Sequence, residues 1–110
     1  MKRQIPRKHR KYYEAIIQLR PASYPIIKFV KDIIKKREDV FISREERQKT
    51  GIDLYISSKS LAMTIGRMLK KRFGGKIILS RSIYGVQKAS SKRLYRLTLC
   101  YREEESAKDL

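Results

Sequence analysis

Lysine and arginine side chains, which are suited to binding anions, are concentrated in the second half of this sequence. The 49 residues from Leu54 to Arg102 contain six Lys, six Arg and no Asp or Glu. Ammonium and guanidinium groups bind phosphate oxygens, the first as point charges and the second as planar donor forks. Because so many like charges oppose a compact fold, they predict a polyanionic partner, most directly the phosphate backbone of a nucleic acid.

The charge of the whole chain supports the same interpretation. Lys and Arg together outnumber Asp and Glu by 28 to 11 among 110 residues, which gives a net charge of +17. Heat-stable proteins also carry many charges, but they add Glu together with Lys to form ion-pair networks. A merely solvated basic surface, an anionic membrane surface and an acidic protein partner stay open as alternatives.

Catalytic chemistry has little support in the sequence. Metal-dependent nucleases need several converging carboxylates, whereas Asp53 is the only acid from Gly51 to Arg102 and is expected at a strand edge. His9 is the only histidine and Cys100 the only cysteine, so neither a disulfide nor a Cys/His zinc site is expected within this chain. We therefore expect a binding protein without catalytic residues, metal or cofactor.

The expected nucleic-acid contacts fall into three groups. Six lie in a basic arm ahead of the folded body: Lys2, Arg3, Arg7, Lys8, Arg10 and Lys11. Eight lie in or after a predicted second helix: Ser58, Lys59, Arg67, Lys70, Lys71, Arg72, Lys76 and Arg81. Four lie in the last loop and strand: Lys88, Lys92, Arg93 and Arg96. We expect the arm to thread between RNA segments, while the helix and the last hairpin hold the backbone.

Two further features have both a functional and a structural interpretation. The backbone N–H groups of Ser57 and Ser58 are suited to receive a phosphate at a helix start, yet the same serines are equally suited to cap the helix. Tyr12, Tyr55 and Tyr84 stand beside basic or polar residues, where a ring can stack on an unpaired base, although core packing is the commoner role.

The chain divides into a basic N-terminal arm over residues 1–11, a single body over 12–102 and an acidic tail over 103–110. Its hydrophobic content of 41% suits one modest core. No apolar run approaches the ~20 residues that span a bilayer. The basic start also lacks the apolar segment of a signal peptide, so a cytoplasmic location is expected.

Hydrophobic periodicity predicts the elements of the first half of the body. The apolar side of the first strand consists of Tyr13, Ala15, Ile17 and Leu19. The expected elements are a strand over 13–20 that ends at Pro21, a helix over 25–37 that is capped by Ser23, and strands over 40–42 and 52–56. The last two should pair as an antiparallel hairpin around a polar loop over 45–51.

The second half of the body predicts a helix and two strands. The helix should begin after Ser57 or Ser58 and end at Gly74. Its apolar arc consists of Leu61, Ala62, Ile65, Met68 and Leu69, and its exposed arc carries Lys59, Arg67 and Lys70. Strands over 76–84 and 93–102 follow, joined by a loop over 85–92. The order β-α-β-β-α-β-β predicts an α+β fold, a ferredoxin-like sheet with both helices on one face and an added C-terminal strand.

Three segments of the body resemble a known family. They run from Tyr12 to Arg20, from Gly51 to Ala62, and over Tyr84-Gly85-Val86 together with Lys92 to Arg96. The most specific part is the Gly-Ile-Asp-x-Tyr-x-Ser-Ser pattern of the second segment. Together they resemble the Nmd-three family, which comprises the large-subunit nuclear export adaptors of eukaryotes and their archaeal relatives. The resemblance covers residues 12–102.

Members of that family bind the large ribosomal subunit during its maturation, so the resemblance implies ribosomal RNA and large-subunit proteins as partners. The Cys-rich zinc modules that precede this region in the family are missing from the sequence, so we expect one family-like module with a basic arm in their place. The preferred interpretation is a component or assembly factor of an archaeal-type large subunit, and permanent and transient attachment both stay open. The alternative is a general RNA- or DNA-binding protein, such as a chromatin protein.

Overall fold

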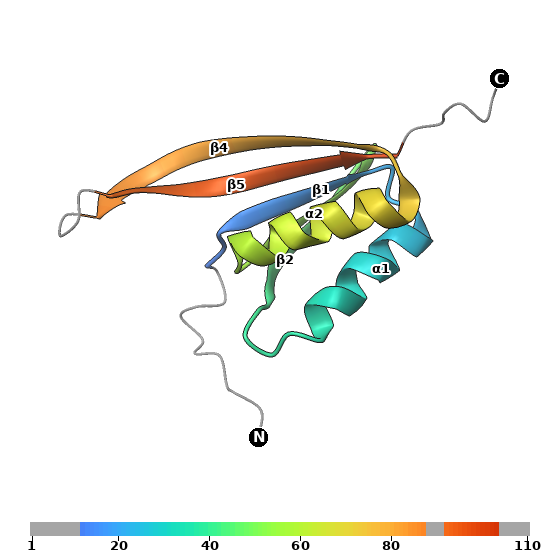
Figure 1. The fold of residues 1–110 in the computed structure, drawn as a ribbon, viewed down its shortest axis with the longest axis horizontal. Helices are drawn as coiled ribbons and strands as arrows, with labels where there is room; N and C mark the ends of the chain where they lie inside the picture. The colour runs from blue at the N-terminus through green and yellow to red at the C-terminus, as the bar shows by residue number, and fades with distance from the viewer. Residues whose placement is uncertain (1–11, 88–91, 104–110) are drawn as a thin grey trace.

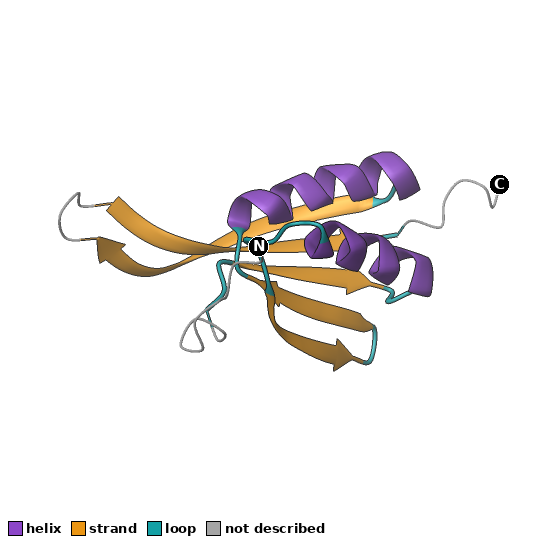
Figure 2. Ribbon diagram, turned by 90° about the horizontal axis from the view of Figure 1, so that it is seen from below, coloured by secondary structure: helices purple, strands orange, loops and turns teal. Residues whose placement is uncertain are grey.

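The computed structural model describes residues 12–87 and 92–103, which form one sheet and two helices. In chain order the elements are β1 (Ala15–Arg20), α1 (Tyr24–Lys35), β2 (Ile42–Gln48), β3 (Gly51–Ile56), α2 (Lys59–Phe73), β4 (Lys76–Gln87) and β5 (Lys92–Arg102). Both helices cover the same face of the sheet, and the hairpin of β4 and β5 extends beyond them (Figure 1 and Figure 2). The predicted α+β architecture is confirmed. Among the described residues, neither helix is long and apolar enough to cross a membrane.

The five strands lie in the order β2-β3-β1-β5-β4. β1 is antiparallel to β3 and parallel to β5, while β2 with β3 and β4 with β5 form antiparallel hairpins. Because β3 lies between the two strands that α1 connects, the first half is the split β-α-β unit of a ferredoxin-like fold. The added strand β5 is inserted beside β1, so β4 forms one edge of the sheet.

The β2–β3 hairpin differs from its sequence prediction in its boundaries. A strand is predicted over 40–42 and a polar loop over 45–51, but β2 runs over Ile42–Gln48 and only Lys49 and Thr50 form the turn. The prediction is wrong because β2 is an edge strand. Such strands form by backbone pairing with one neighbour and carry charged side chains, so they lack apolar alternation. An ion pair of 2.7 Å between Lys31 on α1 and Glu45 also holds β2 in place.

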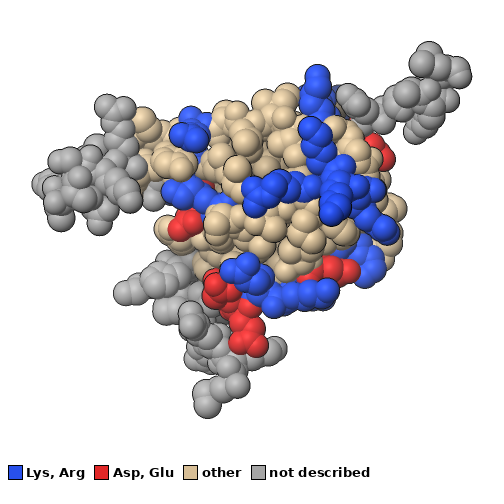
Figure 3. Space-filling view, viewed as in Figure 1, with Lys and Arg blue, Asp and Glu red and all other residues tan. Residues whose placement is uncertain are grey.

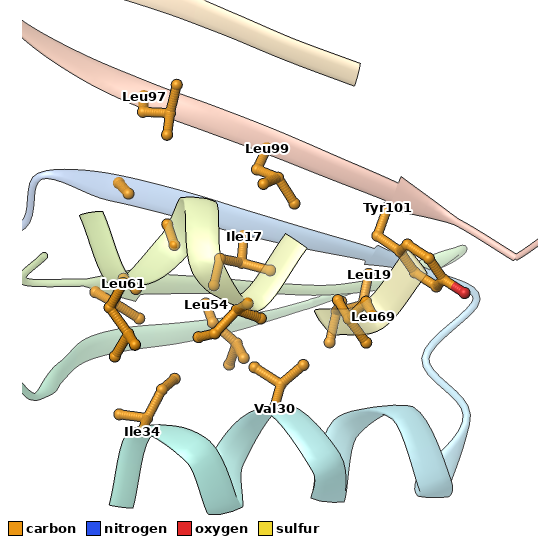
Figure 4. Close-up of a cluster of buried hydrophobic side chains, with 14 of the residues drawn as sticks. Ile17, Leu19, Val30, Ile34, Leu54, Leu61, Leu69, Leu97, Leu99 and Tyr101 are labelled. Atoms are coloured by element: carbon orange, nitrogen blue, oxygen red, sulfur yellow. The ribbon is translucent and has the colours of Figure 1, made fainter. Parts of the chain in front are cut away.

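The hydrophobic core fills the space between the sheet and the two helices (Figure 4). The three inner strands contribute Ala15, Ile17, Leu19, Ile52, Leu54, Ile56, Leu97, Leu99 and Tyr101. The helices contribute Ile26, Val30, Ile34, Leu61, Ala62, Ile65 and Leu69. Tyr101 donates a hydrogen bond of 2.8 Å to the carbonyl oxygen of Gly74. Burial raises the pKa of its phenol, and the nearby Glu103 carboxylate adds to the rise.

Two residues lie on other faces than their patterns predict. Met68 is 39% exposed, because the buried arc of α2 is centred on Ala62 and Ile65 and leaves Met68 at its flank. Tyr13 should share a face with Ala15, but its ring contacts Tyr55 on the uncovered side of the sheet, with 4.9 Å between the ring centres. The chain bends immediately before β1, which reverses the alternation at this point.

Candidate nucleic-acid interface

The C-terminal half of α2 carries a cluster of exposed basic side chains. The helix starts where Ser58 caps it, with the serine Oγ accepting a hydrogen bond of 3.1 Å from the Leu61 N–H, and it ends at Gly74. Its apolar residues face the sheet, which leaves the basic residues of its second half on the solvent side. The exposed cations of this region are Arg67, Lys70, Lys71, Arg72 and Lys76. We refer to these five residues as the α2 basic surface.

Carboxylates pair with three of the cations around α1 but, among the described residues, with none of the α2 basic surface. Three ion pairs surround α1: Lys28 with Asp32 at 3.0 Å, Lys31 with Glu45 at 2.7 Å and Arg37 with Asp39 at 3.2 Å. Within residues 12–87 and 92–103, no ion pair involves a member of the α2 basic surface. Figure 3 shows a band of basic side chains over α2, while acidic side chains lie among the basic ones along α1.

The start of α2 already holds an anion, the carboxylate of Glu14. One of its oxygens accepts a hydrogen bond of 2.9 Å from the Lys59 N–H, at the positive end of the helix dipole. The Ser57 Oγ accepts a hydrogen bond of 3.0 Å from the Phe41 N–H, and Ser58 caps the helix. The capping interpretation of Ser58 is therefore confirmed. A phosphate at these serines would have to displace Glu14, so that contact stays a prediction.

A groove of about 540 Å³ lies between the start of α2 and the β4–β5 hairpin, and it is lined by Glu14, Lys59, Ser60, Met63, Leu79, Arg81, Tyr95 and Leu97. Lys59 is predicted on the exposed arc but is half-buried here. Its Nζ lies 4.0 Å from the centre of the Tyr95 ring and donates a hydrogen bond of 3.2 Å to the Tyr95 carbonyl oxygen. The Arg81 guanidinium lies 5.1 Å from the same ring centre. Lys59 and Arg81 thus form a second basic site at the opposite end of α2.

Residues 12–102 match the family model described as NMD3, second domain. The chain belongs to the NMD3 family. This is the Nmd-three family that the sequence resembles, and the matched residues are those over which the resemblance extends. Comparison with curated proteins finds no match.

One predicted contact residue of this NMD3 domain lies on the other side of the sheet. The Arg96 guanidinium lies 4.2 Å from the centre of the Tyr13 ring, and its Nε donates a hydrogen bond of 3.2 Å to the Tyr13 carbonyl oxygen. Tyr55 lies on this uncovered side as well, with the Arg44 guanidinium 4.2 Å from its ring centre. Because the helices cover the opposite face, Arg96 is separated from the α2 basic surface by the thickness of the sheet.

Several predicted contact residues fall outside the described part of this NMD3 domain. The arm residues Lys2, Arg3, Arg7, Lys8, Arg10 and Lys11 and the loop residue Lys88 belong to undescribed segments. Residues Lys92 and Arg93 lie in β5 and Tyr84 lies in β4, but their side chains are not described. The contacts predicted for these residues stay predictions.

The prediction that Asp53 lies at a strand edge is wrong. Asp53 is buried in β3, which pairs with strands on both sides, and it accepts a hydrogen bond of 2.7 Å from Arg20 Nη2. Strand alternation could have revealed this ion pair, since the register of β1 and β3 places both residues on the same face. Within the described residues, no three His, Cys, Asp or Glu side chains gather as a metal site would require.

Proposed function

We propose that this domain binds ribosomal RNA of the large subunit through the α2 basic surface, as a component or assembly factor of an archaeal-type subunit and without catalytic activity. The observation that carries the proposal is the set of five exposed cations for which the described residues offer no carboxylate. Membership of the NMD3 family supports a large-subunit ligand. The domain would then act on ribosomal particles in the cytoplasm, beside large-subunit proteins.

The arrangement of these cations suits a phosphate backbone. Arg67, Lys70 and Lys71 are spaced by three and four residues, so they lie side by side on the helix surface. The arginine presents a planar fork of donors and the lysines present point charges. Together these groups bind phosphates without reading the base sequence. Because the cations are exposed and unneutralised, counterion release should make the binding strongly dependent on salt.

A triple variant tests this surface. We expect Arg67→Gln, Lys70→Gln and Lys71→Gln together to weaken binding to a structured fragment of large-subunit RNA. Each lost phosphate contact should reduce the slope of log affinity against log salt by about one unit. The matched control replaces Lys28, Lys31 and Arg37 by Gln, which removes the same charges from cations that carboxylates already neutralise. Fluorescence anisotropy at several salt concentrations measures both slopes, and equal slopes in the two folded variants would contradict the proposal.

A general RNA- or DNA-binding role is the second candidate, and the net charge of +17 favours it. That role predicts similar affinity for duplex DNA and for large-subunit RNA at equal salt, because phosphate contacts carry no sequence information. The proposed function predicts tighter binding to the ribosomal RNA fragment. The same anisotropy titration with a DNA duplex of matched length separates the two candidates.

A further inference from the structure

The groove at the start of α2 has features that phosphate binding alone does not use. We propose that it receives a single unpaired nucleotide of the bound RNA. This inference rests on the proposed function and adds to it a site for a base. The groove is lined by residues from the start of α2 and from β4 and β5. The β4–β5 hairpin extends past the helices (Figure 1).

The lining of the groove matches the chemistry of a nucleotide. Met63, Leu79 and Leu97 provide an apolar floor, and Leu79 is 47% exposed although its cross-strand partner Leu99 on the same face is buried. The Arg81 guanidinium, which lies over the Tyr95 ring, presents a plane of the kind on which unpaired bases stack. The volume of about 540 Å³ suits one nucleotide and not a duplex.

The charges of the groove favour the phosphate of that nucleotide. Glu14 is the one carboxylate in the lining, and the Lys59 N–H already holds one of its oxygens. Among the described residues no carboxylate pairs with Arg81, whose guanidinium lies 5.1 Å from the centre of the Tyr95 ring. A guanidinium above a ring keeps its in-plane N–H donors, so Arg81 is able to bind a phosphate at the mouth of the groove.

The position of the groove favours RNA over a protein segment as the occupant. Lys59 lies in the groove and Lys70 belongs to the α2 basic surface, and 11 residues of one helix separate them, about 16 Å along its axis. An RNA strand whose phosphates follow the α2 basic surface is therefore within reach of the groove. An acidic peptide would satisfy Arg81 and Lys59, but it lacks the continuous row of phosphates that the five cations at the far end of the helix suit.

The test compares two RNA hairpins that differ by one bulged nucleotide. The wild-type domain should bind the bulged hairpin about tenfold more tightly than the fully paired one, since stacking of one base is worth this much. Leu79→Thr should remove that preference and leave affinity for the paired hairpin unchanged. The matched control is Ile78→Thr, because Ile78 is the preceding residue, is 50% exposed and points to the other face of the sheet. Ser60→Phe, which narrows the groove from the helix side, should act as Leu79→Thr does.

The outcomes separate this inference from the proposed function. Tight binding of both hairpins with equal affinity would overturn the inference and leave the α2 basic surface intact as an RNA site. If Leu79→Thr and Ile78→Thr changed the preference for the bulged hairpin equally, that would also overturn the inference, because the base would then not enter the groove. Failure to bind either hairpin would contradict the proposed function and the inference together. Binding of an acidic peptide in place of the bulged base would identify a protein partner and likewise overturn it.

Discussion

Single residues in this domain show that charge alone does not mark a binding role. Lys70 and Lys28 both lie on helices with exposed side chains, but only Lys28 has a carboxylate partner, Asp32 one turn away. Arg20 is tied to buried Asp53 and so contributes to the fold. The sequence is sufficient to place Arg67 and Lys70 on the exposed arc of their helix. The sequence is not sufficient to place Lys59, because the Lys59 side chain contacts Tyr95, a residue 36 positions later in β5.

The ion pair of Arg20 and Asp53 supports a stability prediction. Asp53→Ala should lower the free energy of unfolding by about 3 kcal/mol, because it leaves a largely buried guanidinium without its partner. The control Asp32→Ala removes a carboxylate from an exposed ion pair and should cost less than about 1 kcal/mol. Urea denaturation followed by circular dichroism measures both. A loss of equal size in the two variants would contradict the structural role of Asp53.

At the scale of elements, periodicity predicts those that bury an apolar side. α1, α2, β1, β3 and β5 each place alternating or helically spaced apolar residues in the core, and all are expected from the sequence. A strand paired with β3 is expected as well, but at 40–42 and not at Ile42–Gln48, because the residues ISREERQ owe their strand conformation to pairing with β3. The groove cannot be predicted from the sequence either. It depends on how α2 packs against β4 and β5, and that packing is set by tertiary contacts.

Gly51 is the residue on which the close packing of β3 against β1 depends. A Cβ atom at this position would collide with the carbonyl oxygen of Leu19, which is backbone and cannot move without breaking the β1–β3 ladder. Gly51→Ala should therefore lower the free energy of unfolding by about 2 kcal/mol or more.

The neighbouring exposed turn residue provides the control for this prediction. Thr50→Ala should change stability by less than about 0.5 kcal/mol. Chemical denaturation of both variants gives the comparison. A Gly51→Ala domain as stable as the Thr50→Ala domain would show that the two strands are not packed as closely as the structure has them.

At the scale of the whole molecule, the charge is divided between the two helices. Acidic residues neutralise three cations around α1, while the α2 basic surface lies at one end of α2 and the groove at the other. The sequence predicts this excess of charge, but it does not predict that Lys31 is neutralised, because that depends on Glu45 of β2 approaching Lys31 in space. The domain is thus expected to meet RNA along α2.

Sedimentation through a sucrose gradient shows whether the α2 basic surface binds the domain to the large subunit. The wild-type protein, the Arg67/Lys70/Lys71→Gln variant and the Lys28/Lys31/Arg37→Gln control are each mixed with purified large and small ribosomal subunits. We expect the wild-type protein and the control to sediment with the large subunit, while the α2 variant stays at the top of the gradient. Wild-type protein that stays at the top, or that sediments equally with small subunits, would contradict this expectation.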